Sequence, residues 1–229
     1  LRRQRQMCIR DRSQGVGTSI KHFALNNQET LRMTISSEVS ERALREIYLP
    51  AFEEAVKESA PRTVMCSYNK INGEYASENR YLLTDILRKE WGYKGCVVSD
   101  WGAVNNRVKG LQAGLDLEMP YSGGYNDRQI VTAVQEGRLD EAVLDEAVER
   151  VLNVVFAYAQ NRRPETVFDK EADHRKAEDI ETECAVLLEN NGILPLNTDR
   201  KVAYIGGFAE KPRYQGGGSS HINPFRVVS

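Results

Sequence analysis

The dipeptide Asp100-Trp101 stands directly after the short apolar run Cys96-Val97-Val98. So short a run is typical of a strand buried on both faces, because a helix shows its apolar period over ten or more positions. The carboxylate therefore follows the carboxyl end of a predicted strand. In parallel α/β barrels that end carries the chemistry, which makes Asp100 the first catalytic candidate. An aspartate after a buried strand can equally be the N-cap of the next helix, so both interpretations stay open here.

Three other predicted strands also end in polar or aromatic side chains. Cations, a phenol, an indole and carboxylates together suit a neutral polyhydroxylated ligand, since they hydrogen-bond its hydroxyls while an aromatic face covers the ring. Each residue alone has a simpler explanation: Lys21 as a surface lysine, His22 as a hydrogen-bonded core histidine. The further candidates are Lys21, His22, Met65, Tyr68, Trp101, Asp116 and Glu118.

The composition is that of an ordinary globular protein. The chain has 229 residues, 41% hydrophobic and 28% charged, with a formal net charge of −2. This balance gives no reason to expect nucleic acid or an anionic membrane as a partner. No apolar run approaches the roughly 20 residues that span a bilayer.

The four cysteines are widely spaced and include no CxxC pair. Neither a zinc site nor a disulfide framework is predicted, and small buried hydrophobic residues are the favoured interpretation. Unpaired cysteines favour a reducing compartment, hence a cytoplasmic location, while a periplasmic or secreted one stays open. The cysteines are Cys8, Cys66, Cys96 and Cys184.

Strand and helix patterns alternate four times, which predicts an α/β fold with parallel strands and right-handed crossovers. Ser40 is predicted to cap the first helix, and Pro50 to kink or restart it. Because a complete (β/α)8 TIM-type barrel needs about 250 residues, four units predict the C-terminal half of one. The predicted strands are 15–23, 63–67, 96–98 and 115–119, and the helices are 40–56, 80–90, 104–112, 126–136 and 140–159.

The remaining segments predict a second domain that is only begun. A polar stretch from Arg162 to Asp173 is typical of a linker, and it is followed by a helix at 176–190, a strand at 201–206 and a glycine-rich loop at 216–220. The arginine-rich start does not continue the pattern. The predicted divisions are a non-native or disordered tail at 1–13, the half-barrel at 14–160, a linker and connecting helix at 161–198, and the truncated start of a second α/β domain at 199–229.

Several motifs, in order and with their spacing, resemble glycoside hydrolase family 3 in its β-glucosidase-like branch. The likeness runs from about Gln14 to the end of the chain. Later motifs resemble the family's junction and the opening of its second domain. The first set is Lys21-His22-Phe23-Ala24 with Asn26-Asn27-Gln28-Glu29, Met65 to Asn69 with Asn72-Gly73, Ser99-Asp100-Trp101-Gly102 and Ala113 to Pro120; the later set is Leu187 to Asn190, Leu194-Pro195-Leu196 and Gly216 to Ser220.

The resemblance implies a retaining, exo-acting glycosidase with Asp100 as nucleophile, acting on an oligosaccharide or an aryl or alkyl glycoside without cofactor or metal. It implies a general acid/base glutamate beyond Ser229 and further sugar contacts before Gln14, so the chain is expected to be incomplete and inactive by itself. The N-acetylhexosaminidase branch of the family has Pro-Gly-His where this chain has Ala24-Leu25-Asn26, and this difference argues against membership of that branch. The implied substrate contacts are Lys21, His22, Arg32, Met65, Tyr68 and Trp101, with a loop contribution from Ser219 and Ser220.

Alternatives remain at this stage. Within the family the substrate could be a β-xyloside or an α-arabinofuranoside in place of a β-D-glucoside. From a different class, Lys21 could form an imine in a Schiff-base lyase. The chain could also be a non-catalytic sugar-binding remnant. The sequence predicts neither the sugar nor the oligomeric state.

Overall fold

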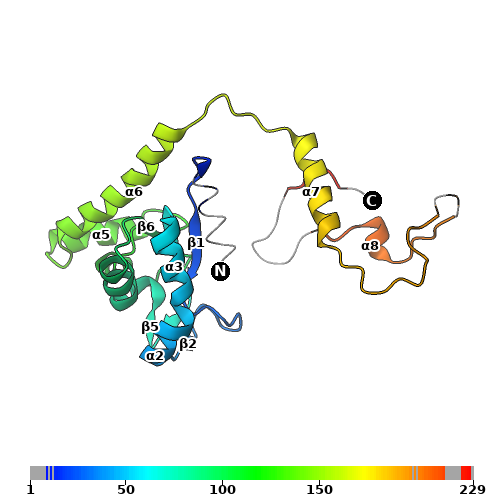
Figure 1. Cartoon of the computed structure of the whole chain (residues 1–229). Coiled ribbons are helices and arrows are strands. Elements are labelled where there is room, and N and C mark those ends of the chain that lie inside the picture. The colour runs from blue at the N-terminus through cyan, green and yellow to red at the C-terminus, as the bar shows by residue number, and fades with distance from the viewer. Residues whose placement is uncertain are drawn as a thin grey trace. The chain divides into compact units, whose positions relative to one another are not determined.

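The computed structural model describes residues 9, 11, 13–197, 199, 201–214 and 223–227. The chain divides into two compact units, Leu1–Arg162 and Arg163–Ser229. Every strand among the described residues belongs to the first unit, while the second holds two helices (Figure 1). The four-part division expected from the sequence stays a prediction.

Three parallel strands form the central sheet, in the order β1 (Ser19–Phe23), β3 (Thr63–Cys66), β6 (Cys96–Val98). Two peptide bonds in and just after β1, Lys21–His22 and Phe23–Ala24, are cis. Since the strands are parallel and in sequence order, their carboxyl ends lie at one edge of the sheet. This confirms the predicted alternation that produces an α/β fold.

The fourth predicted strand, 115–119, pairs with its neighbour less extensively than expected. Its ladder reduces to one parallel bridge between Val98 and Leu117. The amides of Asp116 and Leu117 both donate to the Val97 carbonyl, at 3.0 and 3.1 Å, and Ser99 donates back to the Leu117 carbonyl at 2.9 Å. The segment therefore runs beside β6 as predicted. It does not form a regular strand, because two of its amides donate to the same carbonyl, that of Val97.

The first helical region begins and restarts where the sequence predicts. The Ser40 hydroxyl accepts from the Ala43 amide at 3.2 Å and caps α2 (Glu41–Ala43). A π-helical stretch, η1 (Leu44–Tyr48), follows, and α3 (Pro50–Ser59) begins at the proline. Proline suits the first position of a helix, because an N–H group at that position would have no acceptor within the helix and its absence costs nothing.

The other helices of the first unit lie between and after the strands. The π-helical η3 (Tyr81–Glu90) lies before β6 in the chain and ends at Trp91, whose amide donates to the Ile86 carbonyl. After β6, Asn106 caps the next helix by accepting from the Lys109 amide at 3.0 Å. The later helices are α4 (Arg107–Ala113), α5 (Tyr125–Gln135) and α6 (Glu141–Asn161).

A small second sheet was not predicted. It consists of β2 (Ser36–Ser37), β4 (Lys70–Ile71) and β5 (Glu74–Tyr75), followed by the short 3-10 helix η2 (Ala76–Glu78). The β4–β5 hairpin turns at Asn72-Gly73, with φ of 49° and 88°. Asn-Gly is the preferred pair for such a two-residue turn, so the turn signal was present although the strands are too short to show a pattern.

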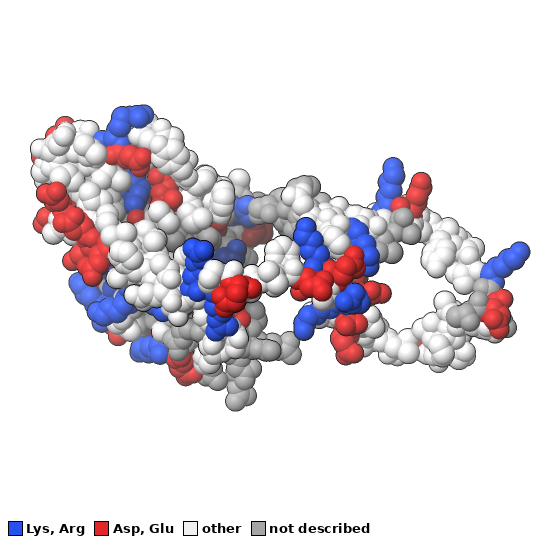
Figure 2. Space-filling view, turned by 90° about the horizontal axis from the view of Figure 1, so that it is seen from above, with Lys and Arg blue, Asp and Glu red and all other residues white. Residues whose placement is uncertain are grey.

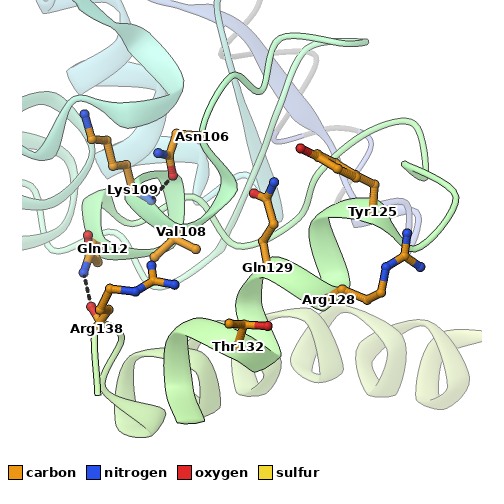
Figure 3. A pocket seen from close by; sticks show the side chains of 9 residues that line it. All are labelled: Asn106, Val108, Lys109, Gln112, Tyr125, Arg128, Gln129, Thr132 and Arg138. Atoms are coloured by element: carbon orange, nitrogen blue, oxygen red, sulfur yellow. Dashed lines mark hydrogen bonds between the residues drawn. The ribbon is translucent and has the colours of Figure 1, made fainter. Parts of the chain in front are cut away.

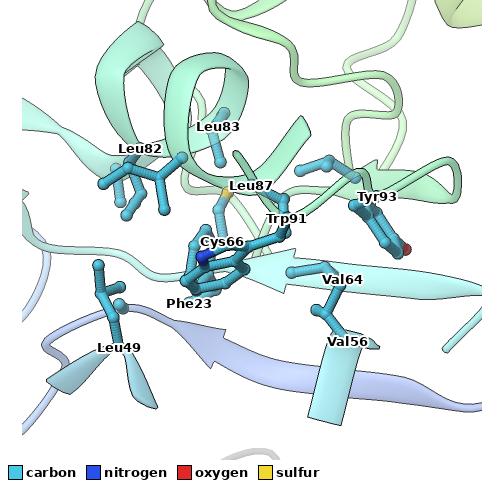
Figure 4. Packing of buried hydrophobic residues seen from close by; sticks show 14 of the residues in the cluster. Phe23, Leu49, Val56, Val64, Cys66, Leu82, Leu83, Leu87, Trp91 and Tyr93 are labelled. Atoms are coloured by element: carbon cyan, nitrogen blue, oxygen red, sulfur yellow. The ribbon is translucent and has the colours of Figure 1, made fainter. Parts of the chain in front are cut away.

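The core lies between the sheet and the helices that cover it (Figure 4). The ring of Phe23 packs edge-on against Phe52 at 5.1 Å and tilted against Trp91 at 5.7 Å. Val64 and Cys66 of β3 are fully buried beside them. Burying these side chains fixes β1 and β3 at the point where both strands end, and so it fixes the segments that leave their carboxyl ends.

The second unit departs from the prediction. Helix α7 (Lys170–Cys184) begins and ends six residues before the predicted 176–190. Its cap is Asp169, whose carboxylate accepts from the amides of Glu171 and Ala172 at 3.0 Å. Residues 201–206 form no strand within the described part, and the short α8 (Gly207–Glu210) follows. Neither α7 nor α8 has a buried residue. The spacing of apolar residues, which was used to predict this helix, therefore does not reflect packing against a core.

Acidic and basic side chains are interspersed on the face shown in Figure 2. Within the described residues, no helix combines the length and the apolar character needed to cross a bilayer.

Candidate active site

Asp100 lies at the end of β6 with 6% of its surface exposed. Its Oδ1 accepts from the Trp101 amide at 2.8 Å, while its Oδ2 is buried and has no hydrogen bond within the described residues. The next helix is capped by Asn106, so Asp100 is not a helix cap. A buried carboxylate oxygen with no hydrogen bond is costly for folding, and a catalytic role is one explanation for such a group.

His22 approaches this oxygen from β1 of the same sheet. Its Nε2 lies 3.3 Å from Asp100 Oδ2. Burial lowers the pKa of His22 below its usual value, while the Asp100 carboxylate acts in the opposite direction. A neutral imidazole beside the carboxylate can donate a hydrogen bond to a sugar hydroxyl or accept one from it.

Tyr68 also lies near Asp100. Its hydroxyl donates to the Trp101 carbonyl at 2.9 Å. Burial and the nearby Asp100 carboxylate raise the pKa of Tyr68, which keeps the phenol protonated as a donor. The guanidinium of Arg32 lies 4.9 Å from the centre of the Tyr68 ring and pairs with Glu29 at 2.7 Å. His22 and Tyr68 thus lie near Asp100, and Arg32 lies beside Tyr68; their roles as substrate contacts stay predictions.

The other predicted contacts differ in what surrounds them. Lys21 is exposed in β1 and forms no ion pair among the described residues. Met65 is half-buried and pairs in register with Val98, two residues before Asp100. Trp101 is 59% exposed. Ser219 and Ser220 fall outside the described residues.

Asp116 was expected at the strand ends with the other candidates, and that expectation is wrong. Its side chain is fully buried against β6, where it accepts from the Val97 amide at 2.7 Å. It pairs with Arg88 at 2.7 Å and with Arg150 at 2.9 Å. These partners neutralise Asp116 inside the fold. Glu118, in turn, accepts from the Asn126 side chain at 2.6 Å.

Ser99, the residue before the turn that carries Asp100, has a structural role that the sequence did not predict. The Ala103 amide donates to the Asp100 carbonyl at 3.1 Å, and Gly102 has φ of 76°. Ser99 is completely buried and hydrogen-bonds the backbone of Met119. In the sequence, the only sign that Ser99 supports the site was its position next to Asp100.

Cys66 and Cys96 are free and buried, as the favoured interpretation of the cysteines predicts. Burial raises the pKa of each thiol to about 12, so both stay protonated and unreactive. Cys184 is free and exposed. Cys8 falls outside the described residues.

A separate hollow, of about 550 Å³, lies between α4 and α5 (Figure 3). Lys109, Arg128 and Arg138 line it together with uncharged side chains, and no carboxylate contributes to it. Arg138 is paired with Glu136. Since glycoside hydrolysis requires carboxylates, this hollow lacks the group that the end of β6 provides.

The chain matches the glycosyl hydrolase family 3 N-terminal domain over residues 4–154. It belongs to this family. The motif resemblance is thereby confirmed over most of the first unit.

Two curated relatives extend the match over nearly the whole chain. Thermostable beta-glucosidase B of Acetivibrio thermocellus is 57% identical over 216 residues, which cover 94% of this chain and 29% of that protein. Exo-alpha-(1->6)-L-arabinopyranosidase of Bifidobacterium longum is 49% identical over 228 residues, covering 95% and 30%. The chain therefore spans less than a third of the length of either relative.

Solved structures show the same fold. Beta-glucosidase 3B of Thermotoga neapolitana in complex with alpha-D-glucose superimposes with a TM-score of 0.86 at 42% identity, covering 98% of this chain and 33% of that one. The family 3 beta-glucosidase of Bifidobacterium adolescentis gives 0.82 at 50% identity, covering 95% and 32%.

Proposed function

We propose that this chain supplies the nucleophile side of a retaining glycoside hydrolase that removes non-reducing-end β-D-glucosyl residues. The observation that carries the proposal is Asp100 Oδ2: a buried carboxylate oxygen with no hydrogen bond among the described residues, beside His22 at a strand end. Family membership and the beta-glucosidase relatives support the same activity.

In the first step, Asp100 Oδ2 attacks the anomeric carbon while the glycosidic oxygen leaves with a proton from a general acid. The product is a glycosyl ester of Asp100. In the second step, water, deprotonated by the same group, attacks the anomeric carbon and releases Asp100 as a carboxylate. Following the resemblance, we assign the acid/base role to a glutamate that is not in this chain. Both steps use only carboxylates and water.

His22, Tyr68, Arg32 and Lys21 are proposed to bind the sugar. His22 lies beside the attacking oxygen, while the exposed ammonium of Lys21 is available to hydroxyls further out. The half-buried Met65 and the exposed ring of Trp101 would bound the subsite. The exposure of Lys21 disfavours a Schiff-base lyase, since imine-forming lysines are activated in apolar pockets or beside another cation.

We also propose that the first unit is the C-terminal half of a (β/α)8 TIM-type barrel within a longer enzyme. Its support is the parallel order β1-β3-β6 with Leu117 beside Val98. The chain covers only 29% and 30% of the length of the two curated relatives, which also supports a longer enzyme. The general acid/base would then come from outside the half-barrel.

The test uses the complete enzyme with aryl β-D-glucoside, β-D-xyloside, α-L-arabinofuranoside and α-L-arabinopyranoside substrates. We expect the glucoside to be hydrolysed with the highest kcat/KM, and proton NMR to show the β-anomer as the first product. An α-anomer formed first would rule out the retaining mechanism. Highest activity on the arabinopyranoside would instead favour the second candidate, suggested by the 49%-identical Bifidobacterium longum relative.

A further inference from the structure

Ser99, the residue before Asp100, joins the end of β6 to the neighbouring segment through both backbone groups of Met119. Its hydroxyl accepts from the Met119 amide at 2.8 Å and donates to the Met119 carbonyl at 3.2 Å. The Ser99 amide donates to the Leu117 carbonyl at 2.9 Å. Ser99 is completely buried, so water does not compete for these bonds.

The Met119 carbonyl also accepts from the Gly102 amide at 2.9 Å. Met119 is therefore bonded to residues on both sides of the Asp100-Trp101 pair. Between them the chain forms a β-turn from Asp100 to Ala103, with Gly102 at φ of 76°. A positive φ at the third position of a turn favours glycine.

This turn determines where the carboxylate oxygens lie. It directs the Trp101 amide to Asp100 Oδ1 at 2.8 Å, so that oxygen is held by a donor. Oδ2 is left without a hydrogen bond among the described residues, 3.3 Å from His22 Nε2. One oxygen is thus held by a backbone amide, while the other faces the His22 ring.

We propose that Ser99 is a positioning residue for glycosylation: by fixing the turn to Met119, it anchors Asp100 Oδ1 and presents Oδ2 as the attacking oxygen. The proposal rests on the proposed function, since it assumes that Asp100 is the nucleophile. Because Ser99 is completely buried, its removal should slow covalent bond formation without weakening sugar binding.

A nearby serine provides a matched control. Ser67 is 1% exposed, follows β3, and donates its hydroxyl to the Ala24 carbonyl at 2.8 Å. Ser67→Ala therefore removes a comparable buried hydrogen bond that does not involve the Asp100 turn. Gly102→Ala perturbs the turn from its other end: a Cβ there meets nothing within 4 Å, so only the backbone conformation is strained.

The experiment measures covalent labelling of the complete enzyme by a 2-deoxy-2-fluoro-β-glucoside, with glucose affinity from calorimetry and Tm as companion measurements. Ser99→Ala should slow labelling about 10- to 100-fold, the order expected for a misplaced reacting group, with glucose affinity unchanged. Ser99→Thr, which keeps the hydroxyl, should recover most of the rate. Gly102→Ala should be slowed as well, whereas Ser67→Ala should lose Tm but label at the wild-type rate.

The proposal is overturned if Ser99→Ala labels at the wild-type rate, or if it slows only as much as Ser67→Ala. Should Ser99→Ala fail to fold, Gly102→Ala decides, and a wild-type labelling rate in that variant would overturn the proposal. Failure of the proposed function gives a different result, because then the wild-type enzyme itself takes no label on Asp100.

Discussion

Asp100 and Asp116 are both buried aspartates beside the same short strand, yet their surroundings prepare them for opposite roles. Asp116 is fully compensated by two arginines and a backbone amide. Asp100 has one bonded oxygen and one without a hydrogen bond among the described residues. A carboxylate whose lone pairs are already occupied is a poor nucleophile, so the structure separates two acids that the sequence placed together.

Replacing Asp100 by alanine in the complete enzyme should reduce kcat to near background, because the covalent route is removed. Azide should restore part of the rate by attacking the anomeric carbon from the vacated position, giving a glycosyl azide. Steady-state rates with and without azide check this. A variant that keeps near wild-type turnover would contradict the assignment.

The lowered pKa of His22 predicts a specific pH dependence of stability. Below its ordinary pKa near 6.5, the unfolded chain binds a proton that the folded histidine still excludes. Stability should therefore fall as pH drops through 6.5 towards the lower folded pKa. His22→Gln should remove this part of the slope when Tm is measured between pH 4.5 and 8. An NMR titration that gives His22 a pKa at or above 6.5 would contradict the prediction.

At the scale of elements, the sequence predicts what local pattern determines. The strand-helix alternation, the Ser40 cap and the restart at Pro50 all follow from spacing and residue type, and all are observed. Helix α7 is displaced by six residues because no side chain of it is buried, so apolar spacing carried no information there. The partners of Asp116 come from η3 and α6, far along the chain, and only the folded structure brings them together.

Asp116, Arg88 and Arg150 form a cluster, here called the Asp116 cluster, that is predicted to hold α6 against β6. Asp116→Ala leaves Arg88 and Arg150 facing each other without their shared carboxylate, and breaking a buried pair costs about 3–5 kcal/mol. Glu46→Ala removes the exposed pair with Arg42 and should cost at most about 1 kcal/mol. Denaturant unfolding of both variants in the complete enzyme measures the difference. Equal losses would show that the cluster does not stabilise this junction.

At the scale of the whole molecule, one face of α6 is apolar and exposed in the described structure. A half-barrel would leave such a face, together with an open strand edge at β1, for the rest of the barrel to cover. The exposed side chains are Val148, Leu152, Val155, Phe156 and Tyr158.

The isolated 229-residue chain should therefore self-associate and show no hydrolysis of an aryl glucoside. Light scattering after size-exclusion chromatography measures association, and calorimetry measures unfolding. A soluble monomer that melts in one cooperative transition would contradict the half-barrel proposal. The number of strand-helix units suggested a half-barrel from the sequence, but which side chains stay exposed could be known only from the structure.

Identifying the residue that becomes glycosylated tests the proposed mechanism at its centre. The complete enzyme is incubated with a 2-deoxy-2-fluoro-β-glucoside bearing a good leaving group, digested, and sequenced by mass spectrometry. We expect one added fluoroglucosyl group on Asp100, in the peptide containing Val98-Ser99-Asp100-Trp101. A label on any other carboxylate would contradict the assignment of Asp100 as the nucleophile.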